Sequence, residues 1–81
     1  MSKKKLLSKT AVRLSSIANE GEEFIAGTFV RICRVRFNLS EVQAVEVLGT
    51  AIDHGAVKFS RFGGDGSTML YVMLKHETIE V

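Results

Sequence analysis

Three groups of Lys and Arg are the residues of this chain best suited to chemistry, and that chemistry is the binding of phosphate. The chain of 81 residues carries a formal net charge of +2, and its basic groups are separated along the sequence from its acidic ones. Segregated positive charge can follow a nucleic acid backbone, although it can also form an ordinary solvated surface. The candidate phosphate contacts are Lys3, Lys4, Lys5, Arg31, Arg34, Lys58 and Arg61.

Residues that could support catalysis or metal binding are present but lack the necessary spacing. His54 and His76 have only Cys33 as a third possible ligand, and no metal-ligand spacing joins them. Asp53 and His54 are adjacent, so on a helix their side chains point apart. The Gly-rich segment 63–66 lies between two predicted strands, which makes it a turn and not a dinucleotide-binding loop. We therefore predict a protein that is not an enzyme, with no catalytic residue, no metal site and no cofactor.

The composition predicts one small globular domain. Hydrophobic residues make up 46% of the chain and charged residues 25%, which is typical of a folded domain with a single core. Cys33 is the one cysteine, so an intrachain disulfide is impossible and a reducing compartment fits. No apolar run approaches the roughly 18 residues of a membrane span, and the basic N-terminus lacks the apolar run of a signal peptide. We expect a cytoplasmic protein without membrane contact.

The segment from Ser40 to Gly55 carries the strongest helix signal. Ser40 and Gln43 have the spacing of a capping box, in which each side chain accepts a hydrogen bond from the backbone of the other residue. Gly55 is a typical helix terminator. The apolar spacing predicts a buried stripe made of Val42, Val45, Leu48 and Ile52.

A β-hairpin is predicted after this helix and another helix well before it. Val57–Arg61 and Met69–Leu74 have strand composition, and the Gly-rich segment 62–67 between them forms the hairpin tip. The helical spacing of Leu7, Ala11, Leu14, Ile17 and Ala18 predicts a first helix that starts at Lys5 or Ser8 and ends at Ala18. The last residues, 76–81, have the composition of a polar tail, in which Ile79 and Val81 could pack against the domain.

Residues 22–37 allow three interpretations. They could form one helix from Glu23 to Phe37, with Gly27 inside it at a cost of about 1 kcal/mol. They could instead form a short strand over 22–26, a break at Gly27 and a helix capped by Thr28. A strand over 28–37 is the third possibility, because this stretch is rich in Val, Ile and Phe. We favour the strand followed by a helix.

Taken together, residues 28–74 resemble the winged helix-turn-helix superfamily. TFVRICRVRF looks like its second helix, NLS like its turn, SEVQAVEVLGTAID like its recognition helix, and GGDGS with TMLYVML like its wing. The resemblance implies an α+β fold with three helices and a C-terminal β-hairpin wing. The domain would cover 8–75, preceded by a basic arm over 1–7 and followed by the tail over 76–81.

This resemblance implies a DNA-binding protein. The recognition helix would enter the major groove, where its N-terminal residues meet base edges. Gln43 could pair with adenine, Glu41 could accept from cytosine and Ser40 could bind a phosphate. Ala44 and Val47 would also face the groove. The Lys and Arg residues named above would contact the backbone. We predict a small transcriptional or replicon regulator that binds duplex DNA as a homodimer, with the first helix and Leu6 and Leu7 at the dimer contact.

The predicted recognition helix departs from this pattern in its charge. It carries Glu41, Glu46 and Asp53 and has no Lys or Arg, so phosphates would meet negative charge there. The alternative hypothesis is therefore a protein-interaction module of the same fold, which docks on a protein partner through its acidic third helix or through an apolar strand of the wing.

Overall fold

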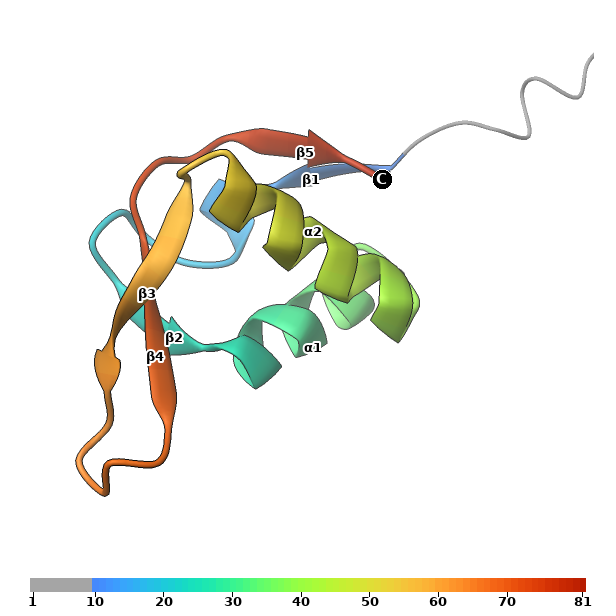
Figure 1. The fold of residues 1–81 in the computed structure, drawn as a ribbon. Coiled ribbons are helices and arrows are strands. Elements are labelled where there is room, and N and C mark those ends of the chain that lie inside the picture. Colours follow the sequence, from blue (N-terminus) through green and yellow to red (C-terminus); the bar gives the residue numbers. More distant parts are fainter. Residues whose placement is uncertain (1–9) are drawn as a thin grey trace, which may run out of the picture.

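The computed structural model describes residues 10–81, which form two α-helices, one short 3-10 helix and five strands in two small sheets (Figure 1). The elements follow one another as β1 (Ala11–Arg13), η2 (Leu14–Ser16), β2 (Glu23–Ile25), α1 (Ala26–Arg36), α2 (Glu41–Asp53), β3 (Val57–Phe62), β4 (Met69–Met73) and β5 (Thr78–Glu80). The fold is α+β, as expected, but the predicted arrangement of three helices and a C-terminal hairpin wing is wrong.

The predicted first helix is replaced by β1 and η2. From Ala11 to Ser15 the side chains alternate between exposed and buried, with Val12 and Leu14 fully buried. This two-residue period is that of a strand, and β1 pairs with β5 from the other end of the chain, with Val12 opposite Ile79. The helical spacing in the sequence was therefore misleading, because a distant partner strand decided the conformation. Residues 5–9 of the predicted helix lie outside the described residues.

The β3–β4 hairpin is confirmed, but it is not the C-terminal element. It is followed by β5, whose Ile79 is 4% exposed, and Val81 packs against the core, so both apolar residues of the expected tail pack on the domain. The backbones of Thr10 and Val81 also exchange hydrogen bonds, of 3.3 Å and 3.0 Å. Figure 1 accordingly shows the C-terminus beside the start of β1.

The segment 22–37 forms a strand followed by a helix, the interpretation that we favoured. β2 pairs with β4 in a three-stranded antiparallel sheet of order β2-β4-β3. The predicted break at Gly27 and cap at Thr28 are wrong, because α1 begins at Ala26 and includes both residues. Ile25 precedes α1 in an extended conformation without a side-chain cap, so the chain turns from strand to helix in one residue.

The two helices pack against each other, and α2 also contacts β3 and β5 (Figure 1). The core between them holds no buried polar or charged residue among those described. An aromatic chain links the sheet to α1, because the ring of Phe24 lies 5.6 Å from that of Phe29 and 6.4 Å from that of Tyr71. The largest fully buried side chains are Phe29, Leu14, Met73, Val12, Val47, Val57 and Cys33.

Candidate functional site

The predicted bounds of helix α2 nearly match the observed ones, but the prediction of which face of the helix is buried is wrong. The residues that pack into the core are Ala44, Val47, Leu48 and Ala51, and all are at most 9% exposed. Of the predicted stripe only Leu48 is buried, whereas Val42, Val45 and Ile52 are 68%, 51% and 39% exposed. Small residues at positions 44 and 51 allow α2 to pack closely against the rest of the core. Ala44 and Val47 therefore face inward and could not read a DNA groove.

The outer surface of α2 carries an unpartnered apolar stripe, which we call the α2 stripe: Val42, Val45, Gly49 and Ile52. These residues recur at intervals of three or four, so they lie along one side of the helix. A Cβ atom added to Gly49 would meet nothing within 4 Å, so internal packing does not require glycine there. Glu46 and Asp53 are also exposed on this outer surface, and α2 contains no Lys or Arg. The stripe is thus an apolar surface with negative borders.

The two polar residues predicted to read DNA, Ser40 and Gln43, bind each other's backbone. Ser40 Oγ accepts a hydrogen bond from the backbone nitrogen of Gln43 at 3.1 Å. Gln43 Oε1 accepts one from the backbone nitrogen of Ser40 at 3.0 Å. The predicted capping box is therefore confirmed. A bidentate contact of Gln43 with adenine would need the same carbonyl oxygen, so it would compete with the cap.

Arg31 and Arg34 lie together along an open groove at the outer side of α1. The groove has a volume of about 580 Å³, and Val30 and Leu39 provide apolar wall. Neither guanidinium has an ion-pair partner within residues 10–81. The complete lining is Gly27, Val30, Arg31, Arg34, Val35, Asn38, Leu39 and Glu41. Glu41 makes this groove partly acidic, so it is not a uniformly basic phosphate track.

Lys58 and Arg61 lie on β3, and only Lys58 is free of an ion pair within the described part of the chain. Arg61 binds Glu23 on β2 through two hydrogen bonds, Nε–Oε2 at 3.1 Å and Nη2–Oε1 at 2.9 Å. The Ser60 hydroxyl donates to the same carboxylate. The Arg61 and Ser60 hydrogen bonds hold the pKa of Glu23 below its ordinary value. The Arg61 guanidinium is therefore already bound to Glu23 across the sheet.

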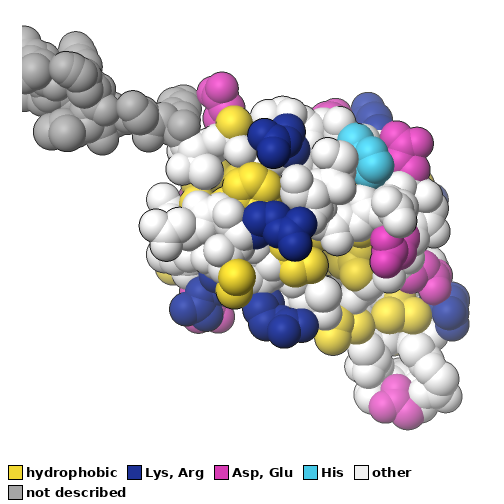
Figure 2. Space-filling view, turned by 180° about the vertical axis from the view of Figure 1, so that it is seen from behind, with side chains coloured by type: hydrophobic (Ala, Val, Ile, Leu, Met, Phe, Trp, Pro, Cys, Tyr) yellow, Lys and Arg dark blue, Asp and Glu magenta, His cyan; other side chains and the backbone are white. Residues whose placement is uncertain are grey.

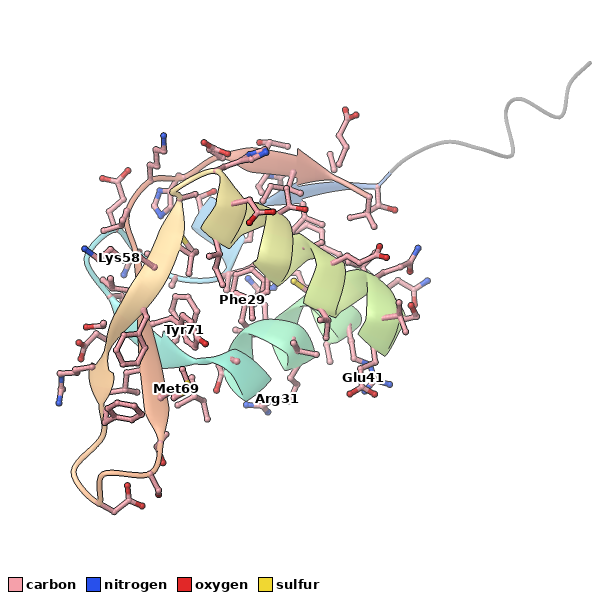
Figure 3. The ribbon with its side chains drawn as sticks, viewed as in Figure 1. Phe29, Arg31, Glu41, Lys58, Met69 and Tyr71 are labelled. Carbon is pink, nitrogen blue, oxygen red and sulfur yellow. The ribbon has the colours of Figure 1, made fainter. Side chains whose placement is uncertain are left out.

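The predicted DNA-binding residues do not converge on one surface. Figure 3 places Arg31 below α1 and Lys58 on β3, at separate parts of the molecule. Seen from behind, Lys and Arg side chains lie beside exposed hydrophobic side chains along the lower edge of the body, and most acidic ones lie to one side (Figure 2). Lys3, Lys4 and Lys5 lie outside the described residues.

The hairpin adds a second exposed apolar surface. Phe59, Phe62 and Met69 are 39%, 54% and 45% exposed. The register shift between Phe59 and Arg61 inserts one residue, so that Phe59 pairs with Tyr71 and Phe62 with Met69 on the same side of the hairpin. The rings of Phe59 and Phe62 lie 5.2 Å apart. The clue in the sequence was the close spacing of two aromatic residues before a Gly-rich tip.

The two His residues form contacts within the fold, and Cys33 lies in the core. His54 Nδ1 lies 2.9 Å from Glu77 Oε1, and His76 Nε2 lies 2.8 Å from the carbonyl oxygen of Ala18. Cys33 is fully buried, and burial raises the pKa of its thiol to about 11. Within residues 10–81 no three His, Cys, Asp or Glu side chains are grouped as metal ligands. No helix in this part of the chain has the length and apolar character needed to cross a membrane.

Comparison of this chain with protein-family models, with curated proteins and with solved structures found no match in any of the three.

Proposed function

We propose that this protein is a non-enzymatic interaction module that docks on a protein partner through the α2 stripe. The observation that carries the proposal is the orientation of α2, which leaves Val42 and Val45 more than half exposed while the opposite side of the helix is buried in the core. Exposed apolar groups that follow one side of a helix are a common basis of helix docking. Contact with a partner would remove this apolar surface from water, which is favourable.

The charge around the α2 stripe defines the chemistry of the partner. Glu46 and Asp53 border the stripe, and α2 offers no cation to an approaching surface. Complementary charge steers association and excludes wrong partners. The partner surface should therefore be apolar with Lys or Arg at its borders, such as an amphipathic basic helix.

Duplex DNA is the second candidate ligand. It is supported by Arg31, Arg34 and Lys58, which are exposed and have no ion-pair partner within residues 10–81. Against this, Glu41 lies in the groove beside the two arginines, and Arg61 is bound to Glu23. Protein docking is better supported, because the apolar residues and charges of α2 all favour the same class of partner.

Fluorescence anisotropy with defined probes tests the proposal. Three labelled peptides of about 14 residues, or four helical turns, would be compared: a helix with a Leu stripe bordered by Lys, the same helix bordered by Glu, and a scrambled form of the first. A random DNA duplex would be the fourth probe. The proposal predicts that the Lys-bordered helix binds best and that the double variant Val42→Lys with Val45→Lys abolishes its binding.

The matched control is Met69→Lys, which also places a cation on an exposed apolar residue, but on the β3–β4 hairpin, away from α2 (Figure 3). It should leave peptide binding unchanged. Equal binding of all three peptides, or unchanged binding by the α2 double variant, would contradict the docking proposal. DNA binding that falls linearly with the logarithm of salt concentration, and that is lost in Arg31→Glu with Arg34→Glu, would favour the second candidate.

A further inference from the structure

We propose that a second copy of this chain docks on the outer side of α1 about a twofold axis, through Arg31, Arg34, Val35 and Glu41. We call these four residues the α1 face. The proposal uses residues outside the α2 stripe and does not depend on the proposed function. It also differs from the dimer contact predicted from the sequence, which involved Leu6 and Leu7.

The first observation is the exposure of Val35. At 79% it is the most exposed large hydrophobic side chain within residues 10–81. Val35 lines both the groove of about 580 Å³ and a smaller hollow of about 180 Å³, whose lining also includes Ile32 and Arg36. An apolar side chain that lines two hollows can enter a hollow of an identical surface while receiving the equivalent side chain in its own.

The second observation is that the α1 face carries both signs of charge. Arg31 and Arg34 are three residues apart on α1, and Glu41 is the first residue of α2. Figure 3 shows Arg31 and Glu41 at the same lower edge of the helix pair, and Arg31 is the middle residue of α1 whereas Glu41 lies beyond its end. Both groups line the groove.

Two copies of the α1 face related by a twofold axis would be complementary in charge. In such an interface, if one residue contacts a second residue of the other copy, the reverse contact also forms. The basic part of the α1 face would therefore meet Glu41 of the other copy, twice, with the two Val35 side chains between these contacts. A phosphate backbone or an acidic peptide would satisfy the arginines but leave Glu41 facing negative charge. A second copy of the chain offers opposite charge both to the two arginines and to Glu41.

The size of the α1 face limits the strength of the dimer. Helix α1 has 11 residues and is therefore roughly 16 Å long. An interface centred on it lies at the low end of interface sizes, below about 1,200 Å² in total, which is typical of transient association. We expect a dimer in rapid exchange with the monomer, weakened by salt because its charged contacts are at the surface.

Sedimentation velocity over a concentration series, with a charge-reversal mixture, tests the proposal. One variant is Arg31→Glu with Arg34→Glu, which makes the α1 face entirely acidic. The other is Glu41→Arg, which makes it entirely basic. The wild-type chain should sediment increasingly as a dimer as its concentration rises. Each variant alone should remain monomeric, and an equimolar mixture of the two should form a heterodimer.

Arg13→Glu is the matched control, because Arg13 is exposed on β1 and lies outside the α1 face, so this reversal should leave dimerisation intact. The serine double variant at Leu6 and Leu7 should also still dimerise. Circular dichroism checks that each variant is folded. If a reversal variant fails to fold, Val35→Asp replaces it and should give a monomer. A monomeric wild type at millimolar concentration, dimerisation by either variant alone, or a mixture that stays monomeric would overturn the proposal.

Discussion

Glu23 and Arg61 join two strands that are not neighbours. They lie on β2 and β3, with β4 between them, and Arg61 Nη2 donates to Glu23 Oε1 at 2.9 Å across the outer surface of the sheet. Because Ser60 donates to the same carboxylate, one acidic side chain connects the edge strand before α1 to the hairpin. Arg61 was predicted to bind DNA, but its guanidinium forms this intramolecular ion pair with Glu23.

The pKa of Glu23 gives the first prediction. The Arg61 hydrogen bonds lower it below the ordinary value, so Arg61→Gln should raise it back toward that value. A pH titration of the side-chain carboxyl resonance by NMR measures this shift. Arg34→Gln is the control, because Arg34 has no ion-pair partner within the described residues, and it should leave the pKa of Glu23 unchanged.

This lowered pKa also fixes the sign of a pH effect on stability. The Glu23–Arg61 contact stabilises the fold at pH values above the unfolded-state pKa of Glu23, and the effect is lost as the pH falls through the lower folded-state pKa. Urea unfolding of wild type and Arg61→Gln should therefore differ at neutral pH and converge in acid. A difference that grows on acidification would contradict the assignment.

Removal of the α2 cap gives the second prediction. Ser40→Ala deletes the hydroxyl that accepts from the Gln43 amide, so it should lower the free energy of unfolding by about 1 kcal/mol. Denaturant unfolding measures the loss. Ser15→Ala removes an exposed hydroxyl outside α2 and should have little effect. If the two substitutions cost the same, the capping box contributes nothing to stability.

The orientation of α2 gives the third prediction. Ala44 is fully buried, so Ala44→Leu should overpack the core and cost about 1–3 kcal/mol in the free energy of unfolding. Gly49 lies in the same helix but has open space, so Gly49→Ala should stabilise the protein by up to about 1 kcal/mol. Thermal or chemical unfolding of both variants distinguishes the two sides of α2. The opposite order of stability would indicate that α2 is rotated and that the α2 stripe is buried.

The burial of Cys33 gives the fourth prediction. A pKa of about 11 keeps the thiol protonated at neutral pH, and thiolate is the reactive form. A disulfide reagent should therefore react with the native protein only slowly and with the urea-unfolded protein at once. Rapid labelling of the native protein would contradict the assignment of Cys33 to the core.

The same thiol makes the fold less stable in alkaline solution. Because the folded-state pKa of Cys33 is raised, its contribution is complete below the unfolded-state pKa and is lost as the pH rises from there through about 11. The variant Cys33→Ala lacks this ionisation, so its loss of stability with rising alkaline pH should be smaller than that of the wild type.

The sequence predicted the elements whose signals are local. The capping box and the left-handed Gly55, with a φ of 76°, mark the ends of α2 within a few residues. The β3–β4 hairpin was also predicted, because its Gly-rich tip lies between two apolar strands. Such signals depend on neighbouring residues, so a single sequence contains them.

The first helix and the buried side of α2 were mispredicted because they depend on distant partners. The segment from Ala11 to Leu14 fits helical spacing and strand alternation equally, and only pairing with β5 selects the strand. In α2 the sequence favoured Val42 and Val45 for the core, but packing against the rest of the fold buries the side of the helix that carries Ala44, Val47, Leu48 and Ala51. The ion pair of Arg61 was not predicted for a similar reason, since its partner Glu23 is far away in the sequence.

The central claim is that the α2 stripe is a docking surface, and NMR mapping tests it most directly. Isotope-labelled protein would be titrated with the Lys-bordered helical peptide while backbone amide shifts are followed. We predict that the largest shifts fall on α2 around Val42, Val45, Gly49 and Ile52, and that Glu46→Lys reduces them. Shifts confined to α1 and β3, or none at saturating peptide, would contradict the account.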